Sequence, residues 1–211
     1  MMSKTVIPTG YAPLLDLYQT QTAIGFLKRN FEQKLCDALN LKRVSAPLFV
    51  EPSTGLNDDL NGVERPVAFD IKETGRVAQV VHSLAKWKRM ALYKYGFKAG
   101  EGLYTDMNAI RRDEEMDNLH SVYVDQWDWE KVITPADRTL DYLQTTVRAI
   151  SGAIAGTLSE LKTHYPQLTT ELPAEVAFVT TQQLEDLYPA MSPKERENAY
   201  LKEHKAVFLM Q

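Results

Sequence analysis

Apolar residues recur at three- and four-residue steps in two long stretches of the chain, which is the spacing of one face of an α-helix. The first stretch covers about residues 14–39 and stops at Asn40. The second begins at Thr134 and Pro135, an N-cap residue followed by a first-turn proline, and it continues to Tyr165. Each stretch therefore predicts one long helix.

Shorter apolar runs predict strands, some of which pair as hairpins. The predicted strands are residues 42–52, 67–72, 76–82, 103–110, 120–130, 176–179 and 206–211. The first is interrupted by Pro47, which belongs at a sheet edge. Ser83 is placed to cap a short helix over residues 84–95, and Ser192 begins a capping-box pattern.

Two hairpins between helices predict an α+β fold, an antiparallel sheet flanked by helices. The Gly-, Asn- and Asp-rich residues 53–66 predict a loop. Residues 1–12 are expected to form a flexible arm, and residues 13–211 a single domain. The apolar ending over residues 206–211 is typical of a buried strand, so either its partner strands come earlier in the chain or the domain continues past it.

The composition narrows the class of protein without naming a function. The chain has 211 residues, 44% hydrophobic and 25% charged, with a net charge of −4. This balance gives no general reason to expect nucleic-acid or membrane binding. A single cysteine excludes an internal disulfide and favours a reducing, cytoplasmic compartment.

The predicted strand 120–130 carries the first candidate chemistry. Side chains alternate between the two faces of a strand, so Gln126, Asp128 and Glu130 share one face, and Trp127 and Trp129 the other. One interpretation puts the tryptophans in the core and the polar face in water. The other makes the polar face the floor of a site for an ammonium group, or for Mg²⁺ among phosphates.

Two basic segments also allow two interpretations each. Lys86, Lys88 and Arg89 surround a tryptophan, either as a solvated helix face or with one lysine capturing a carboxylate. Residues 110–115 read IRRDEE, either a charged hairpin loop or a loop whose arginine clamps a phosphate with parallel hydrogen bonds.

These segments, in this order, resemble the adenylate-forming core of class II aminoacyl-tRNA synthetases. HSLAKWKR (82–89), GEGLYTDMNAIRRDE (100–114) and HSVYVDQWDWE (120–130) are more similar still to the signatures of ammonia-dependent asparagine synthetases, the aspartate–ammonia ligases. The resemblance runs from about Thr20 to the last residue. It implies a class II synthetase-like fold and a reaction in which aspartate, ATP and ammonia give asparagine, AMP and pyrophosphate.

The resemblance also implies residue roles, partners and a location in the cytoplasm. Arg111 would hold the α-phosphate of ATP, with Glu114 in the ATP site, and Glu130 would lie near Mg²⁺. Lys88 would pair with a carboxylate of aspartate, and Gln126 would hydrogen-bond the substrate. Asp128 and Asp58 would take its ammonium group, Asp58 being preferred to Asp59 by alignment. Residues 20–50 would form a homodimer contact, and no tRNA is expected as a partner.

One departure from the family leaves alternatives open. The family continues past the strand that matches residues 206–210 and carries a third, glycine-rich motif whose arginine binds the γ-phosphate. That motif is not in this sequence, so we expect little synthetase activity from the 211-residue chain alone. The alternatives are a relative that binds aspartate or dimerises without adenylation, and a scaffold with fortuitous charge.

Overall fold

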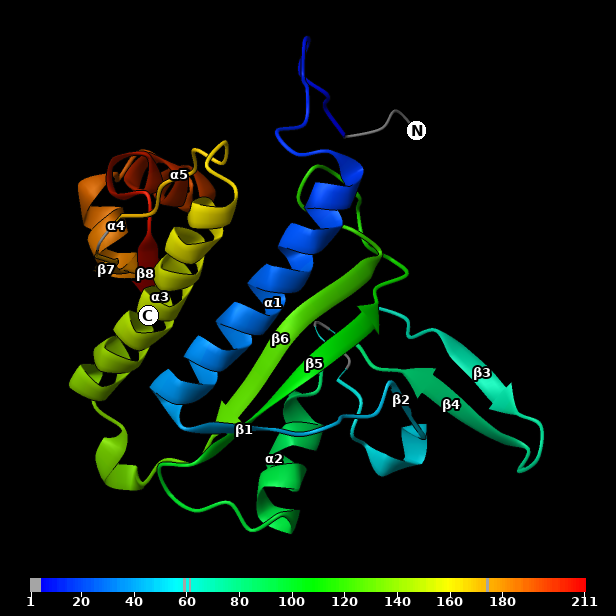
Figure 1. The fold of residues 1–211 in the computed structure, drawn as a ribbon. Helices are drawn as coiled ribbons and strands as arrows, with labels where there is room; N and C mark the ends of the chain where they lie inside the picture. Colours follow the sequence, from blue (N-terminus) through cyan, green and yellow to red (C-terminus); the bar gives the residue numbers. More distant parts are fainter. Residues whose placement is uncertain (1–4, 59, 61, 174) are drawn as a thin grey trace. The chain divides into compact units, whose positions relative to one another are not determined.

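The computed structural model describes residues 5–58, 60, 62–173 and 175–211 (Figure 1). The chain divides into two compact units. One comprises the described part of Met1–Ala12 with Asn40–Ile133, and the other comprises Pro13–Leu39 with Thr134–Gln211. The expectation of a single domain over residues 13–211 stays a prediction, as does the flexible arm, whose first four residues lie outside the described part.

The first unit contains two three-stranded sheets. In one sheet the order is β1-β5-β6; β5 is parallel to β1 and antiparallel to β6. In the other the order is β2-β4-β3, all antiparallel. The elements are β1 Leu41–Arg43, β2 Phe49–Val50, η1 Pro52–Thr54, β3 Ala68–Ile71, β4 Arg76–Val80, α2 Ala85–Lys94, β5 Gly102–Ile110 and β6 Tyr123–Lys131.

Both hairpins predicted from the sequence are confirmed as β3–β4 and β5–β6. The single strand predicted over residues 42–52 is wrong, because the chain around Pro47 leaves one sheet after β1 and enters the other at β2. The predicted cap Ser83 is also displaced. Its hydroxyl accepts from Ala85 N at 3.2 Å, while Leu84 occupies the N-cap position.

Helix α2 packs against one face of the β5–β6 hairpin and forms the core of this unit (Figure 1). The buried residues of this core are Val50, Val81, Leu84, Trp87, Ala91, Leu92, Leu103, Met107 and Ala109. A large apolar side chain contributes about 1.5–3 kcal/mol when it is removed from water. This packing fixes α2, and with it Lys88, against the face that carries the polar residues of β6.

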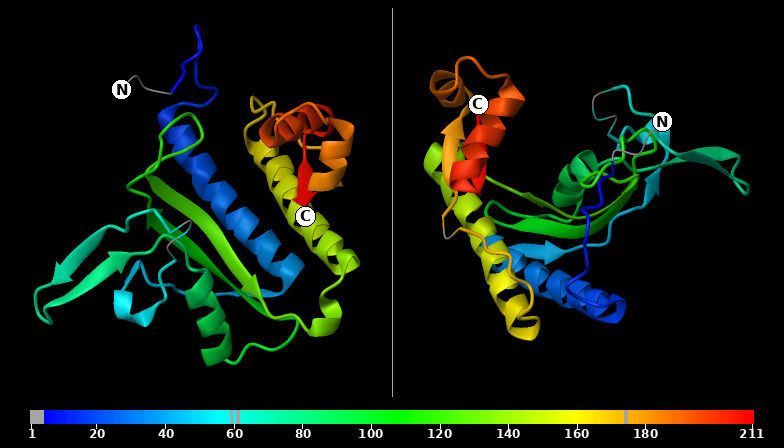
Figure 2. Two further views of the ribbon diagram at one scale, coloured as in Figure 1. Left: turned by 180° about the vertical axis from the view of Figure 1, so that it is seen from behind. Right: turned by 90° about the horizontal axis from the view of Figure 1, so that it is seen from above.

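The second unit is built on two long antiparallel helices (Figures 1 and 2). Lys34 of the first pairs with Glu160 of the second, with Nζ and Oε1 2.6 Å apart. Arg148 lies over the ring of Phe178, 5.0 Å from its centroid, and so links the second helix to β7. The elements are α1 Leu17–Leu39, η2 Pro135–Asp137, α3 Leu140–His164, β7 Ala177–Thr180, α4 Thr181–Leu187, α5 Pro193–His204 and β8 Val207–Met210.

The start predicted for the second long helix needs a correction. Thr134 caps the short turn η2, where its backbone N–H donates to Asp137 Oδ2 at 2.8 Å. Helix α3 begins at Leu140, and Thr139 is its N-cap, accepting from Tyr142 N at 3.2 Å. A second Thr near the same place therefore makes the cap, because the chain turns once before the helix begins.

The C-terminal apolar run forms β8, which pairs in parallel with β7. The strand is confirmed but its complete burial is not, since Leu209 is 38% exposed. None of the helices in the described part of the chain has both the length and the apolar character needed to cross a lipid bilayer.

Candidate active site

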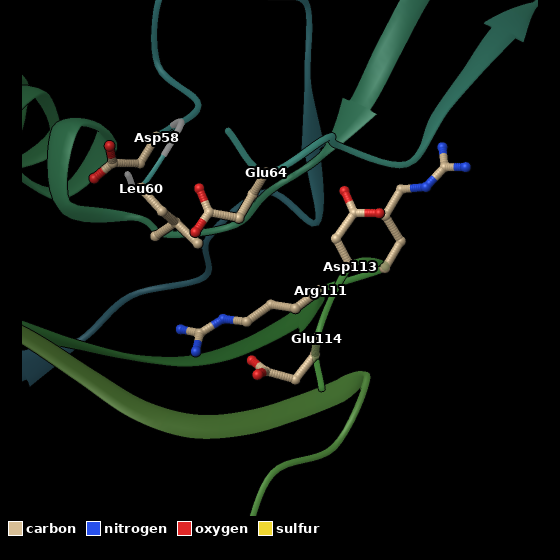
Figure 3. A pocket seen from close by; sticks show the side chains of 7 residues that line it. Asp58, Leu60, Glu64, Arg111, Asp113 and Glu114 are labelled. Atoms are coloured by element: carbon tan, nitrogen blue, oxygen red, sulfur yellow. The ribbon is translucent and has the colours of Figure 1, made fainter. Parts of the chain in front are cut away.

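A cavity of about 550 Å³ lies in the first unit, between the loop before β3 and the turn after β5 (Figure 3). The residues that line it are Asp58, Leu60, Glu64, Arg111, Arg112, Asp113 and Glu114. Three of the seven, Asp58, Arg111 and Glu114, are residues that the sequence predicted for substrate and ATP binding. Asp59, the alternative to Asp58, lies outside the described residues.

Arg111 follows the last residue of β5 and continues the ladder of the hairpin, since its N–H donates to Val122 O at 2.8 Å. Its guanidinium group points into the same space as the carboxylates of Glu64 and Glu114 (Figure 3). The Nε atom is buried and has no hydrogen-bond partner among the described residues. Leaving a charged donor buried and unpaired is unfavourable. An anion that reached this nitrogen would remove the cost.

The second group of predicted residues lies where α2 meets β6. Lys88 is 4% exposed, and its Nζ donates to Asp128 Oδ1 and, at 2.9 Å, to Trp129 O. Glu130 Oε2 lies 3.4 Å from the same Nζ, and Arg89 Nε lies 3.5 Å from Glu130 Oε1. Two cations and two carboxylates therefore neutralise one another at this point.

This arrangement adds a contact that the sequence did not predict. Lys88 and Asp128 were expected to hold different groups of one substrate, and here they bond to each other. A lysine ammonium group has three donors and an ionised carboxylate about four acceptor positions. Two of the three donors on Lys88 Nζ are used by Asp128 and Trp129 O. Glu130 lies within ion-pair distance of the same atom, so a ligand would compete with these partners. The roles of Lys88 and Asp128 toward that ligand stay predictions.

Glu130 was also expected near Mg²⁺, and its surroundings do not favour that. Both of its oxygens lie within ion-pair distance of a lysine or arginine, which would repel a divalent cation. Across the described residues, no group of three or more His, Cys, Asp or Glu is arranged to hold a metal ion. The role of Glu130 as a metal ligand stays a prediction.

The register of the hairpin shows how the two groups are related. Gln126 lies opposite Met107 and Asp128 opposite Thr105, and alternation puts Arg111 on this same face of the sheet. Between Val122, which bonds to the Arg111 backbone, and Asp128 the strand advances by about 20 Å. One face thus carries an arginine at one end, an amide between, and a lysine–carboxylate pair at the other.

Three features in or near the site were not predicted from the sequence. Glu64 lines the cavity, and Arg65 pairs with Asp113 beside it. His82 is 1% exposed, and neither ring nitrogen has a hydrogen-bond partner among the described residues. His82 could have been noticed in the sequence, because it lies at the start of the segment that contains Lys88. The other two depend on contacts between loops far apart in the sequence, for which no local signal exists.

Comparison with known proteins gives one family and one fold. A family model described as aspartate–ammonia ligase matches residues 18–211. The aspartate–ammonia ligase of Ruminiclostridium cellulolyticum is 60% identical over 210 residues, which are 99% of this chain and 62% of the relative. That of Lactobacillus johnsonii is 57% identical over 206 residues, 97% of this chain and 61% of the relative. The chain thus spans about three fifths of these relatives.

Solved structures of tRNA synthetases share the fold. Asparaginyl-tRNA synthetase of Entamoeba histolytica superposes with a TM-score of 0.59 at 10% identity, covering 92% of this chain and 44% of the synthetase. The enzyme of Pyrococcus horikoshii complexed with asparaginyl-adenylate gives 0.57 at 14% identity, covering 89% and 44%. These likenesses concern the fold alone. They confirm the predicted α+β, class II synthetase-like core.

Proposed function

Because the chain belongs to the aspartate–ammonia ligase family, we propose that it serves the ATP-dependent amidation of L-aspartate by ammonia, through an aspartyl-adenylate. The observation that carries this proposal is Arg111, whose buried Nε lacks a hydrogen-bond partner within the described residues, at the wall of an acid-lined cavity. The Lys88–Asp128 pair lies on the same sheet face. An arginine so placed suits a phosphate, and the pair suits an amino acid.

In the first step a carboxylate oxygen of aspartate attacks the α-phosphorus, and the bond to the β-phosphate oxygen breaks to release pyrophosphate. The Arg111 guanidinium stabilises the charge that develops on the α-phosphate oxygens. Asp58 and Asp128 accept hydrogen bonds from the ammonium group of aspartate, while Lys88 donates to the second carboxylate of aspartate. ATP enters as its Mg²⁺ complex, so the cation arrives with the substrate.

In the second step the ammonia nitrogen attacks the acyl carbon, the bond to the AMP oxygen breaks, and a proton is lost to give asparagine. Gln126 lies between the two ends of the face and hydrogen-bonds the adenylate. Glu114 contacts the nucleotide from the turn after β5. Ammonia, and not tRNA, is the proposed acceptor, and the cytoplasm, where ATP and free aspartate are available, is the proposed location.

A second candidate is a module that binds aspartate without adenylating it. The observation that favours it is coverage, since the chain matches only 61–62% of the length of the two relatives described above. The unpartnered Nε of Arg111 argues for adenylation, because a protein that binds only aspartate has no use for a buried phosphate donor.

Binding and turnover together test the proposal. We expect the chain to bind a sulfamoyl analogue of aspartyl-adenylate in calorimetry, and to bind the lysyl analogue at least tenfold more weakly. Aspartate, MgATP and ammonium are then supplied, and AMP and asparagine are measured. Equal amounts of both products support the ligase, and aspartate binding without AMP supports the module. If the chain binds neither aspartate nor the aspartyl analogue, both the ligase and the module are contradicted. Robust turnover would contradict the low activity expected from the sequence.

We also propose that residues 20–50 form a homodimer contact. Support comes from apolar side chains exposed on this segment: Ile24 at 46%, Leu48 at 53% and Phe49 at 43%. We expect light scattering after gel filtration to give twice the chain mass of 24.0 kDa. Leu48→Asp should shift the protein to the monomer mass. A wild-type monomer at micromolar concentration would contradict the proposal.

A further inference from the structure

The loop that carries Asp58 and Glu64 is tied to the rest of the unit at both ends. At its start, Asn57 Oδ1 accepts from His82 N at 2.9 Å, and Asn57 Nδ2 donates to Val80 O at 3.3 Å. These bonds attach the loop to the segment that leads into α2. Asp58, the next residue, is therefore held close to the segment that leads to Lys88.

At its other end the loop is joined to the turn after β5. Arg65 donates to Asp113 three times: from its backbone N at 2.9 Å, from Nε at 3.0 Å, and from a terminal nitrogen to the second oxygen. These hydrogen bonds from Arg65 hold the pKa of the Asp113 carboxyl well below its usual range, so the pair stays charged in mildly acidic solution as well. A bidentate pair with an added backbone bond fixes direction as well as distance.

The Arg65–Asp113 pair therefore joins the two walls of the cavity. Asp113 itself lines the cavity, and Arg65 directly follows Glu64, which lines it from the other side. In the proposed function one wall supplies an aspartate ligand and the other supplies the phosphate ligand. A contact that sets the spacing of the walls must affect both substrates together.

Resting on the proposed function, we infer that Arg65 and Asp113 are a positioning pair that couples the binding of aspartate to the binding of ATP. Neither residue needs to touch a substrate. When one substrate draws its wall into place, the pair carries the other wall with it, so the second substrate meets a site already ordered. Coupling of this kind typically changes affinity by about 5–150-fold.

The structure provides a matched control in the same unit. Arg76 and Glu51 form an ion pair of 2.9 Å with side chains 68% and 29% exposed, against 68% and 27% for Arg65 and Asp113. The control pair does not line the cavity. Exposed pairs contribute little to folding stability, so neither Arg65→Met nor Arg76→Met should lower the melting temperature by more than a few degrees.

The test measures aspartate affinity by calorimetry with and without α,β-methylene-ATP, which cannot be cleaved at the α-phosphate. We expect the analogue to tighten aspartate binding at least fivefold in wild type and in Arg76→Met, and less than twofold in Arg65→Met and Asp113→Ala. The charge reversal Arg65→Asp with Asp113→Arg should restore part of the coupling. Full coupling in Arg65→Met, or equal loss in Arg76→Met, would overturn the inference.

Hydrogen exchange without ligand separates this inference from the proposed function. The amides of residues 62–65 should exchange at least tenfold faster in Asp113→Ala than in Arg76→Met, because the Arg65 N–H loses its acceptor. If wild type binds no aspartate, the proposed function fails and exchange alone decides. Faster exchange then still supports a positioning pair, and equal exchange in the two variants overturns it.

Discussion

Replacing Arg111 by methionine is expected to abolish adenylation without lowering stability. An arginine that stabilises charge at the reacting phosphate is worth about 10²–10³ in rate. Its buried Nε has no hydrogen-bond partner in the described part of the chain, so the folded state gains nothing from that donor. Because little turnover is expected of this chain alone, the loss is measured as weaker calorimetric binding of the sulfamoyl analogue of aspartyl-adenylate, together with aspartate-dependent exchange of pyrophosphate into ATP. Differential scanning calorimetry should give a melting temperature equal to or above that of wild type.

Arg111→Lys refines this test, because lysine keeps the charge but not the two parallel donors. We expect exchange between that of wild type and that of Arg111→Met. Arg76→Met, outside the cavity, should match wild type. Unchanged exchange in Arg111→Met would place the phosphate elsewhere, and a melting temperature several degrees lower would show that Arg111 serves the fold.

Local pattern was enough to predict the β5–β6 hairpin and the residues that share its face. Strand alternation fixes which side chains go together, so Gln126, Asp128 and Glu130 follow from sequence once a strand is assumed. It cannot show what lies over that face. The register of the two strands is needed to see that Leu103 and Met107, which belong to the core, are neighbours of these polar residues on the same face. These neighbours show that the polar residues face the interior of the unit.

Contacts between distant segments could not be predicted in the same way. Lys88 and Asp128 are 40 residues apart, and their bond depends on how α2 docks on the sheet. Arg65 and Asp113 are 48 residues apart on two loops. Helix starts failed for a different reason. Ser83 and Thr134 are good cap residues, but Leu84 is the N-cap of α2, and Thr134 caps the short turn η2 while Thr139 caps α3.

The Lys88–Asp128 pair gives the prediction with the second large effect. Lys88→Met should lower the free energy of unfolding by about 3–5 kcal/mol, because it leaves the Asp128 carboxylate largely buried without its cation. Urea unfolding followed by tryptophan fluorescence measures this change. Arg89, on the same helix but with its side chain 72% exposed, is the control, and Arg89→Met should change the unfolding free energy by about 0.5 kcal/mol or less.

The double variant Lys88→Met with Asp128→Asn separates the two roles that Lys88 combines. Removing both charges together avoids a lone buried ion, so the double variant should be more stable than Lys88→Met. Aspartate binding should be lost in both, since the substrate carboxylate finds no ammonium group in either. If stability returns and binding does not, the Lys88–Asp128 pair is kept charged for the ligand, and the bond between the two residues makes a buried ammonium group tolerable before the ligand arrives. A double variant that binds aspartate as wild type does would contradict the ligand role, and one as unstable as Lys88→Met would contradict the pair as an energetic unit.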